Sequence, residues 1–246
     1  MIELATFEHG DGRRLAVKQR PGRGPALLFL PGYMSDMEGS KALALDSWAA
    51  ATGRAMLRLD YGGCGASEGE FEAQSLADWL GDVLASIDRL VEGPVLLVGS
   101  SMGGWLMLLA ALARPERVAG LVGIAAAPDF TSWGFPDEEK KRIRETGRLE
   151  QPSPYGDRPY LTTRTFWESG ERNLLLGGEI AIRCPVRLLH GQDDSDVPWR
   201  NPLLLAERLR SADVQTILIK DGDHRLSREP DIALLIRTVD LLLEQL

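Results

Sequence analysis

Residues 94–113 read PVLLVGSSMGGWLMLLAALA, and this stretch decides the fold. Its first part, residues 94–98, is a short apolar run typical of a buried parallel strand. Residues 105–113 hold strong helix formers, and Arg114-Pro115 ends the helix they predict. Between the two lies Gly99-Ser100-Ser101-Met102-Gly103, a GxSxG motif on a strand-to-helix turn.

Such a turn would present Ser101 at the N-terminus of the helix. Glycines at the flanks allow the sharp turn without side-chain clashes, and the Met102 N–H and the helix dipole would face an oxyanion formed at the serine. The motif alone is weak evidence, because a glycine turn with Ser101 as a helix N-cap has the same sequence. Residues elsewhere in the chain are needed to distinguish these two interpretations.

Strands and helices alternate along the chain. The patterns predict two extended stretches joined by a turn in residues 4–19, strands at 26–30, 55–59, 118–125, 184–189 and 214–220, and helices at 41–51, 76–91 and 231–243. Fully apolar strands alternating with helices indicate a mostly parallel sheet with helices on both faces. The fold class is therefore α/β.

The alternation stops after Pro128 for about fifty residues, which is too long for a structureless loop in a compact domain. We therefore expect residues 128–180 to form a helical cap, inserted before the next strand of the sheet. Residues 1–127 and 181–246 would form the core.

Composition limits the partners and the compartment. The net charge of −8 and the pI near 5.0 oppose binding to nucleic acid or to an anionic membrane. The two cysteines, Cys64 and Cys184, lack metal-ligand spacing and suit a reducing compartment. Residues 1–18 contain no apolar signal segment, and no run is long enough to span a bilayer. We expect a cytoplasmic protein, or an organellar matrix protein if processed, without integral membrane contact; the oligomeric state is left open.

A nucleophilic serine needs a histidine base. His224 is the candidate, because it stands in a loop directly after the last predicted strand, where parallel sheets place functional residues. His9 lies in the predicted N-terminal turn and is expected to be solvated. His190 ends a predicted strand and is expected to fix the loop that follows.

The acid that orients the base should lie in the loop after the predicted strand that His190 ends. Residues 190–198, HGQDDSDVP, offer three carboxylates there: Asp193, Asp194 and Asp196. An acidic loop could also hold a cation, but it has neither EF-hand spacing nor a Cys/His cluster, so we expect no metal.

The chain resembles the α/β-hydrolase superfamily along its length apart from the cap. Residues 190–198 fit the HGxxDxxVP pattern of that superfamily, which implies that Asp194 is the acid. The order Ser101, Asp194, His224 is the order of this superfamily. Residues 60–67, DYGGCGAS, resemble its structural DxxGxGxS loop, which implies that Cys64 is a buried thiol.

A narrower resemblance is to mitochondrial palmitoyl-protein thioesterases with acyl-glucuronide esterase activity and to their bacterial relatives. Residues 30–36 (LPGYMSD), 99–108 (GSSMGGWLML) and 184–191 (CPVRLLHG) carry it. Pro31-Gly32 is the most discriminating pair, because most other relatives have His-Gly there. The resemblance implies that the Tyr33 N–H joins the Met102 N–H in the oxyanion hole.

The expected function is hydrolysis of carboxylic esters or thioesters through an acyl-enzyme on Ser101, with no cofactor. Acyl esters and thioesters, S-acylated proteins among them, are the expected partners. Two alternatives stay open: cleavage of a carbon–carbon bond or acyl transfer by the same triad, and a non-catalytic ligand-binding scaffold.

The predicted cap suggests what the substrate carries. An apolar wall above Ser101 would suit an acyl chain or an aromatic acid. The aromatic and leucine residues available for it are Trp133, Phe135, Tyr155, Tyr160, Phe166, Trp167 and Leu174-Leu175-Leu176. An arginine near the mouth could pair with a carboxylate on the leaving group. The candidates for that role are Arg142, Arg144, Arg158 and Arg164.

Overall fold

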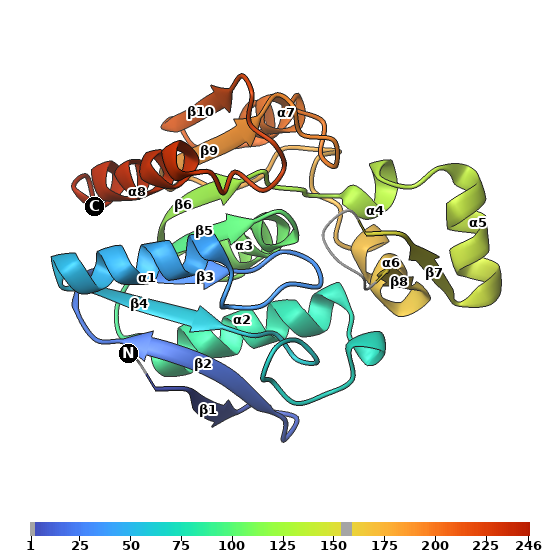
Figure 1. Cartoon of the computed structure of the whole chain (residues 1–246), viewed down its shortest axis with the longest axis horizontal. Coiled ribbons are helices and arrows are strands. Elements are labelled where there is room, and N and C mark those ends of the chain that lie inside the picture. The colour runs from blue at the N-terminus through green and yellow to red at the C-terminus, as the bar shows by residue number, and fades with distance from the viewer. Residues whose placement is uncertain (1–2, 154–158) are drawn as a thin grey trace.

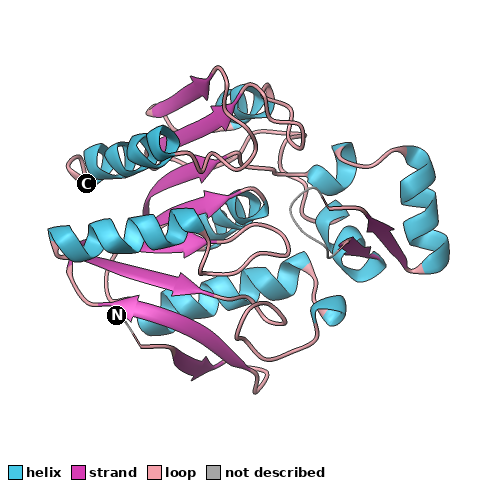
Figure 2. Cartoon of the chain, in the orientation of Figure 1, coloured by secondary structure: helices cyan, strands magenta, loops and turns pink. Residues whose placement is uncertain are grey.

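The computed structural model describes residues 3–153 and 159–246 and has one large central sheet (Figures 1 and 2). Its strands are β1 (Ala5–Glu8), β2 (Arg14–Arg20), β3 (Arg23–Leu30), β4 (Arg54–Leu59), β5 (Val95–Ser100), β6 (Val118–Ile124), β9 (Val186–Gly191) and β10 (Val214–Ile219). They lie in the order β1-β2-β4-β3-β5-β6-β9-β10. β2 pairs antiparallel with both β1 and β4, and every other neighbouring pair is parallel. This is the mostly parallel α/β sheet that the alternation predicted.

Helices cover both faces of the sheet (Figure 1). α1 (Ser40–Thr52) and α8 (Glu229–Leu243) pack on one face, and α2 (Leu76–Leu90), α3 (Met102–Ala113) and α7 (Asn201–Arg208) pack on the other. A single turn of 3-10 helix, η1 (Phe71–Ala73), precedes α2. β5 is a central strand and is fully buried. α3 begins at its carboxyl end. Among the described residues, no helix combines the length and the apolar character needed to cross a bilayer.

Two features of the core differ from the sequence-based expectations. Helix α7 was not expected, although Pro202 in its first turn and the apolar residues 203–205 favour a helix there. His9 was expected to be solvated, but its side chain is only 19% exposed and pairs with Asp11. The reason is a polar network that joins the β1–β2 turn to α2.

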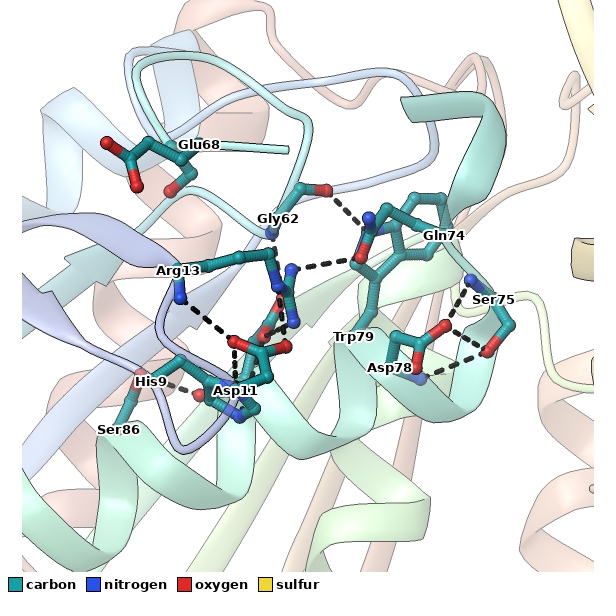
Figure 3. A network of polar contacts seen from close by, with 12 residues as sticks. His9, Asp11, Arg13, Gly62, Glu68, Gln74, Ser75, Asp78, Trp79 and Ser86 are labelled. Atoms are coloured by element: carbon teal, nitrogen blue, oxygen red, sulfur yellow. Dashed lines mark hydrogen bonds and ion pairs between the residues drawn. The ribbon is translucent and has the colours of Figure 1, made fainter. Parts of the chain in front are cut away.

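This network fixes the loop that follows β4 (Figure 3). Arg13 donates to Gln74 and to the fully buried Asp82. Asp82 also accepts the N–H of Gly62, whose carbonyl accepts the indole N–H of Trp79. Because every link is buried or partly buried, the network holds Trp79 in place behind the carboxyl ends of the strands.

The segment between β6 and β9 folds into α4 (Phe130–Trp133), α5 (Asp137–Thr146), β7 (Arg148–Gln151), β8 (Tyr160–Thr163) and α6 (Arg164–Glu171). It stands beyond the carboxyl ends of the parallel strands (Figure 1). The expected helical cap corresponds to α4, α5 and α6, but the segment also contains the antiparallel pair β7 and β8, which was not expected. Tyr160, Thr162 and Thr163 favour an extended chain, and pairing with β7 satisfies its backbone.

Candidate active site

Ser101 occupies a strained turn between β5 and α3. Its φ of +53° is rare for a residue with a side chain, so the surrounding structure must hold it. Its N–H donates to Ile124 at 2.9 Å, and its carbonyl accepts the N–H of Ala127 at 3.0 Å. A Cβ on Gly99 would meet the Gly103 carbonyl oxygen at 2.4 Å, so the glycines of the motif are needed for close packing. This is the elbow that the motif predicted.

Three loops bring Ser101, His224 and Asp194 together. The His224 Nε2 lies 3.1 Å from the Ser101 Oγ, and its Nδ1 lies 2.9 Å from the Asp194 Oδ2. His224 follows β10, and Asp194 follows β9. The predicted nucleophile, base and acid therefore form one continuous chain of hydrogen bonds.

Asp194 is held by four donors. Its Oδ1 accepts the N–H groups of Asp196 and Val197, each at 2.8 Å, while its Oδ2 faces His224 and also His190 at 3.2 Å. Burial alone raises the pKa of this carboxyl, but the hydrogen bonds from the two histidines outweigh burial and hold the pKa well below its usual range. Asp194 is therefore a carboxylate throughout the neutral and mildly acidic range, ready to accept the Nδ1–H of His224.

His190 fixes the acid loop, in agreement with its expected role. Its ring is fully buried, and its Nε2 lies 3.1 Å from the Val197 carbonyl as well as near Asp194. Both neighbours are acceptors, so the Nε2 atom carries a proton and donates it. Asp193 and Asp196, the other two carboxylates of the loop, are exposed and contact neither His190 nor His224 in any bond that the described residues make.

Two backbone N–H groups next to Ser101 have no hydrogen-bond acceptor among the residues that the structure describes. Met102 is the first residue of α3, so its N–H has no partner within the helix. Within residues 3–153 and 159–246, the Tyr33 N–H likewise has no hydrogen-bond acceptor. Gly32 approaches the Ser101 Cβ closely, since an added Cβ there would lie 3.4 Å from it. The two predicted oxyanion donors therefore belong to segments that flank Ser101.

Comparison with known proteins assigns the family. Residues 25–142 match the family model described as "Serine aminopeptidase, S33". The human mitochondrial palmitoyl-protein thioesterase ABHD10 is 43% identical over 247 residues, which cover 99% of this chain and 81% of the relative. The chain belongs to the ABHD10 family of α/β-hydrolases. It is thus a hydrolase with a serine at the nucleophile elbow, and the predicted fold class and resemblance are confirmed.

Solved structures agree with this assignment. ABHD10 from mouse superposes with a TM-score of 0.93 at 42% identity and 99% coverage of both chains. A putative hydrolase from Agrobacterium vitis gives the same TM-score at 38% identity, also with 99% coverage of both chains. The ABHD10 architecture therefore extends over the whole chain, including the segment between β6 and β9.

The Tyr33 side chain connects its own loop, which holds the predicted oxyanion donor, to the segment between β6 and β9 of this ABHD10-family chain. Its hydroxyl donates to the Leu161 carbonyl, and the Leu161 N–H contacts the Met34 sulfur at 3.4 Å. The ring packs against Phe166 at 4.7 Å and against Trp79 at 5.8 Å between centroids. Residues 33 and 34 are therefore held by β8 on one side and by the ring of Trp79 on the other, which fixes the loop that carries the predicted oxyanion donor.

A cavity of about 660 Å³ opens above Ser101. Its apolar lining comes mainly from α4 and the residues after it, namely Phe130, Trp133 and Phe135. Its polar lining comes mainly from loops of the sheet and includes Ser35, Lys41, Asp196, His224 and Arg225. An ABHD10-type site of this kind can hold a substrate with an apolar part and a polar part.

The predicted substrate-binding residues divide into three groups. Trp133, Phe135 and Tyr160 line the cavity, whereas Phe166, Trp167 and residues 174–176 do not. Tyr155 and Arg158 lie outside the described residues.

The expectation that an arginine stands near the mouth of the cavity was wrong for Arg142, Arg144 and Arg164. Arg142 borders a separate pocket, Arg144 stacks over the Trp167 ring at 5.4 Å, and Arg164 donates to the Arg144 carbonyl.

Several residues of the cavity were missed from the sequence, among them Met34, Lys41, Phe130 and Arg225. For Lys41 a signal existed, because a lysine in the first turn of a helix opposes the helix dipole.

Neither cysteine is placed to act as a nucleophile. Burial raises the pKa of the Cys64 thiol to about 12 and that of Cys184 to about 11. Cys64 is a buried thiol, as the resemblance implied. In the described part of the chain, no three His, Cys, Asp or Glu side chains are grouped so that they could hold a metal ion.

Proposed function

We propose that this hydrolase cleaves carboxylic thioesters and esters through an acyl-enzyme on Ser101, with His224 as the base and Asp194 as the residue that orients it. The hydrogen-bond chain from Ser101 through His224 to Asp194 is the observation that supports the proposal most directly. The name of the ABHD10 relatives, palmitoyl-protein thioesterase, supports thioesters and S-acylated proteins as substrates.

Acylation begins when the Ser101 hydroxyl gives its proton to the His224 Nε2 and its oxygen attacks the carbonyl carbon of the substrate. The carbonyl oxygen becomes an oxyanion, which the N–H groups of Tyr33 and Met102 stabilise together with the N-terminus of α3. The intermediate collapses, the bond to the leaving sulfur or oxygen breaks, and the His224 proton passes to that atom.

Deacylation repeats these steps with water. His224 takes a proton from the water, the hydroxyl attacks the acyl-enzyme, and the released carboxylic acid leaves Ser101 with its proton restored from His224. Asp194 stabilises the imidazolium formed in each half without becoming protonated, which its lowered pKa permits.

Residues 128–180 act as a cap in this proposal, and residues 1–127 and 181–246 act as the catalytic core. The apolar lining from Phe130, Trp133 and Phe135 supports a site for the acyl chain. The protein is cytoplasmic or resides in an organellar matrix, and the mitochondrial relatives support the second compartment.

Lengthening the acyl chain of a thioester series is expected to raise kcat/KM until the cavity is filled. Each buried methylene contributes up to about 0.8 kcal/mol, or about fourfold. Acetyl to palmitoyl thioesters of one thiol, assayed by release of that thiol, give the trend. Ser101→Ala serves as the background control. Acetyl or butyryl as the best acyl group, with longer chains progressively worse, would contradict an acyl-chain site beneath α4.

Activity is expected to be lost on the acid side of the pH profile. Protonated His224 cannot accept the Ser101 proton, so protonation of the base lowers kcat/KM. Asp194 does not contribute to this loss under mildly acidic conditions, because its lowered pKa keeps it ionised. A kcat/KM profile with one thioester measures this, and EDTA is expected to leave it unchanged. A flat profile, or inhibition by EDTA that zinc or magnesium reverses, contradicts the histidine mechanism.

A further inference from the structure

Lys41 places an ammonium group in the wall of the catalytic cavity, where no carboxylate of the described residues pairs with it. Its side chain is partly buried, and its only hydrogen-bond acceptor among the described residues is the carbonyl of Arg225, at 2.5 Å. An ammonium has three donors, so two remain. Within the described part of the chain, no carboxylate forms an ion pair with it. The mechanism proposed above does not use this group.

Two positive contributions, a helix dipole and a neighbouring arginine, act at Lys41. Lys41 lies in the first turn of α1, where the helix dipole is positive and where no acidic residue stands. The positive charge of Arg225 acts on the amine more strongly than either of the carboxylates of Asp223 and Asp231, which oppose it. Burial and Arg225 together lower the pKa of Lys41 to about 8. Burying a charged group without an ion-pair partner costs desolvation free energy. A lysine retained at this position therefore indicates that an anion binds beside it.

The position of Lys41 relative to His224 indicates which part of the substrate the anion belongs to. The carbonyl that Lys41 contacts is that of the residue directly after His224. His224 protonates the leaving sulfur or oxygen, so that atom must lie on the His224 side of the scissile bond. The apolar lining comes mainly from α4 and the residues after it, and not from α1 or the loop of His224. The contact with the Arg225 carbonyl thus associates Lys41 with the leaving group and not with the acyl chain.

We propose that Lys41 forms a subsite for an anionic group, a carboxylate or a phosphate, carried by the leaving thiol or alcohol of the substrate. The proposal rests on the proposed function, because it presupposes that acyl transfer to Ser101 releases such a group. Arg225 strengthens the field at this subsite, and Asp196, which lines the same cavity, weakens it. A fixed ammonium suits either anion, since it binds as a point charge.

Two matched substrate pairs test the subsite. One is the octanoyl thioester of 3-mercaptopropionate and that of 3-mercaptopropionamide; the other is S-octanoyl phosphopantetheine and S-octanoyl pantetheine. The wild-type chain is expected to favour the anionic member of at least one pair by about tenfold in kcat/KM, as a charge-assisted hydrogen bond gives. The pair that shows the preference identifies carboxylate or phosphate as the anion.

Variants then assign the preference to Lys41. Lys41→Met is expected to bring the ratio close to one, and Lys41→Arg to retain most of it. Lys220→Met is the matched control, because Lys220 is exposed and does not line the cavity, and it is expected to keep the wild-type ratio. The wild-type ratio is also expected to decline above pH 8 as Lys41 loses its proton, which a purely structural lysine would not cause.

Ratios near one for both pairs in the wild type overturn the subsite, and so does a ratio that Lys41→Met leaves intact. Neither result affects the proposed function, provided that hydrolysis still requires Ser101. Absence of Ser101-dependent hydrolysis of all four thioesters would instead overturn the proposed function itself.

Discussion

Ser101→Ala is expected to lower kcat by about 10³-fold or more, with little change in stability. The substitution removes the oxygen that attacks the substrate and leaves His224 and Asp194 without a nucleophile to activate. Alanine meets the same positive φ that serine accepts here, so the turn keeps its conformation. Single-turnover hydrolysis of an octanoyl thioester, with thermal unfolding as the check on folding, measures both quantities.

Ser100→Ala is the matched control for Ser101→Ala. Ser100 is the last residue of β5, lines the same cavity and is buried, but within the described residues it forms no hydrogen bond with His224. A fluorophosphonate probe is expected to label the wild type and Ser100→Ala and to fail on Ser101→Ala. Labelling that persists in Ser101→Ala, or that disappears only in Ser100→Ala, would place the nucleophile elsewhere.

The elbow could be predicted from the sequence because its signal is local. A buried strand, a glycine turn and a helix follow one another within twenty residues, 94–113, and each carries its own pattern. The same holds for α1, where Gly53 ends the helix in a left-handed conformation. The mostly parallel character of the sheet could also be predicted from the alternation of strands and helices, because parallel strands need helical crossovers.

Features that depend on distant contacts were not predictable in the same way. β7 and β8 are four residues long each, and neither carries a pattern that outweighs its surroundings, so only their mutual pairing reveals them. Lys41 and Phe130 stand almost ninety positions apart in the sequence, yet both line the cavity. The hydroxyl of Tyr33 finds its acceptor at Leu161, and no spacing in the sequence predicts that contact.

The acid of the triad falls between these cases. The loop after β9 offers three carboxylates, and the residues alone do not rank them; the family pattern selected Asp194. The structure supplies the physical difference. The side chain of Asp194 turns inward, where it is fully buried and meets four donors, while Asp193 and Asp196 stay exposed.

Asp194→Asn is expected to lower kcat by about 10³- to 10⁴-fold. An amide offers one acceptor oxygen, whereas the carboxylate uses both of its oxygens to accept hydrogen bonds. If the amide oxygen faces the N–H groups of Asp196 and Val197, its NH₂ group points at His224 Nδ1 and His190 Nε2. His224 must then keep Nδ1 unprotonated and carry its proton on Nε2, which is the wrong tautomer to accept the Ser101 proton.

The neighbouring carboxylates provide the contrast for Asp194→Asn. Asp193→Asn is expected to leave kcat within about threefold of the wild type, because it removes a charge from an exposed side chain that does not contact the triad. Asp196→Asn borders the cavity, so its effect belongs mainly to KM. Steady-state kinetics of the three variants on one thioester distinguish them. Should Asp196→Asn prove the most damaging to kcat, the acid would be two residues further along the loop, and the hydrogen bond from His224 to Asp194 would have only a structural role.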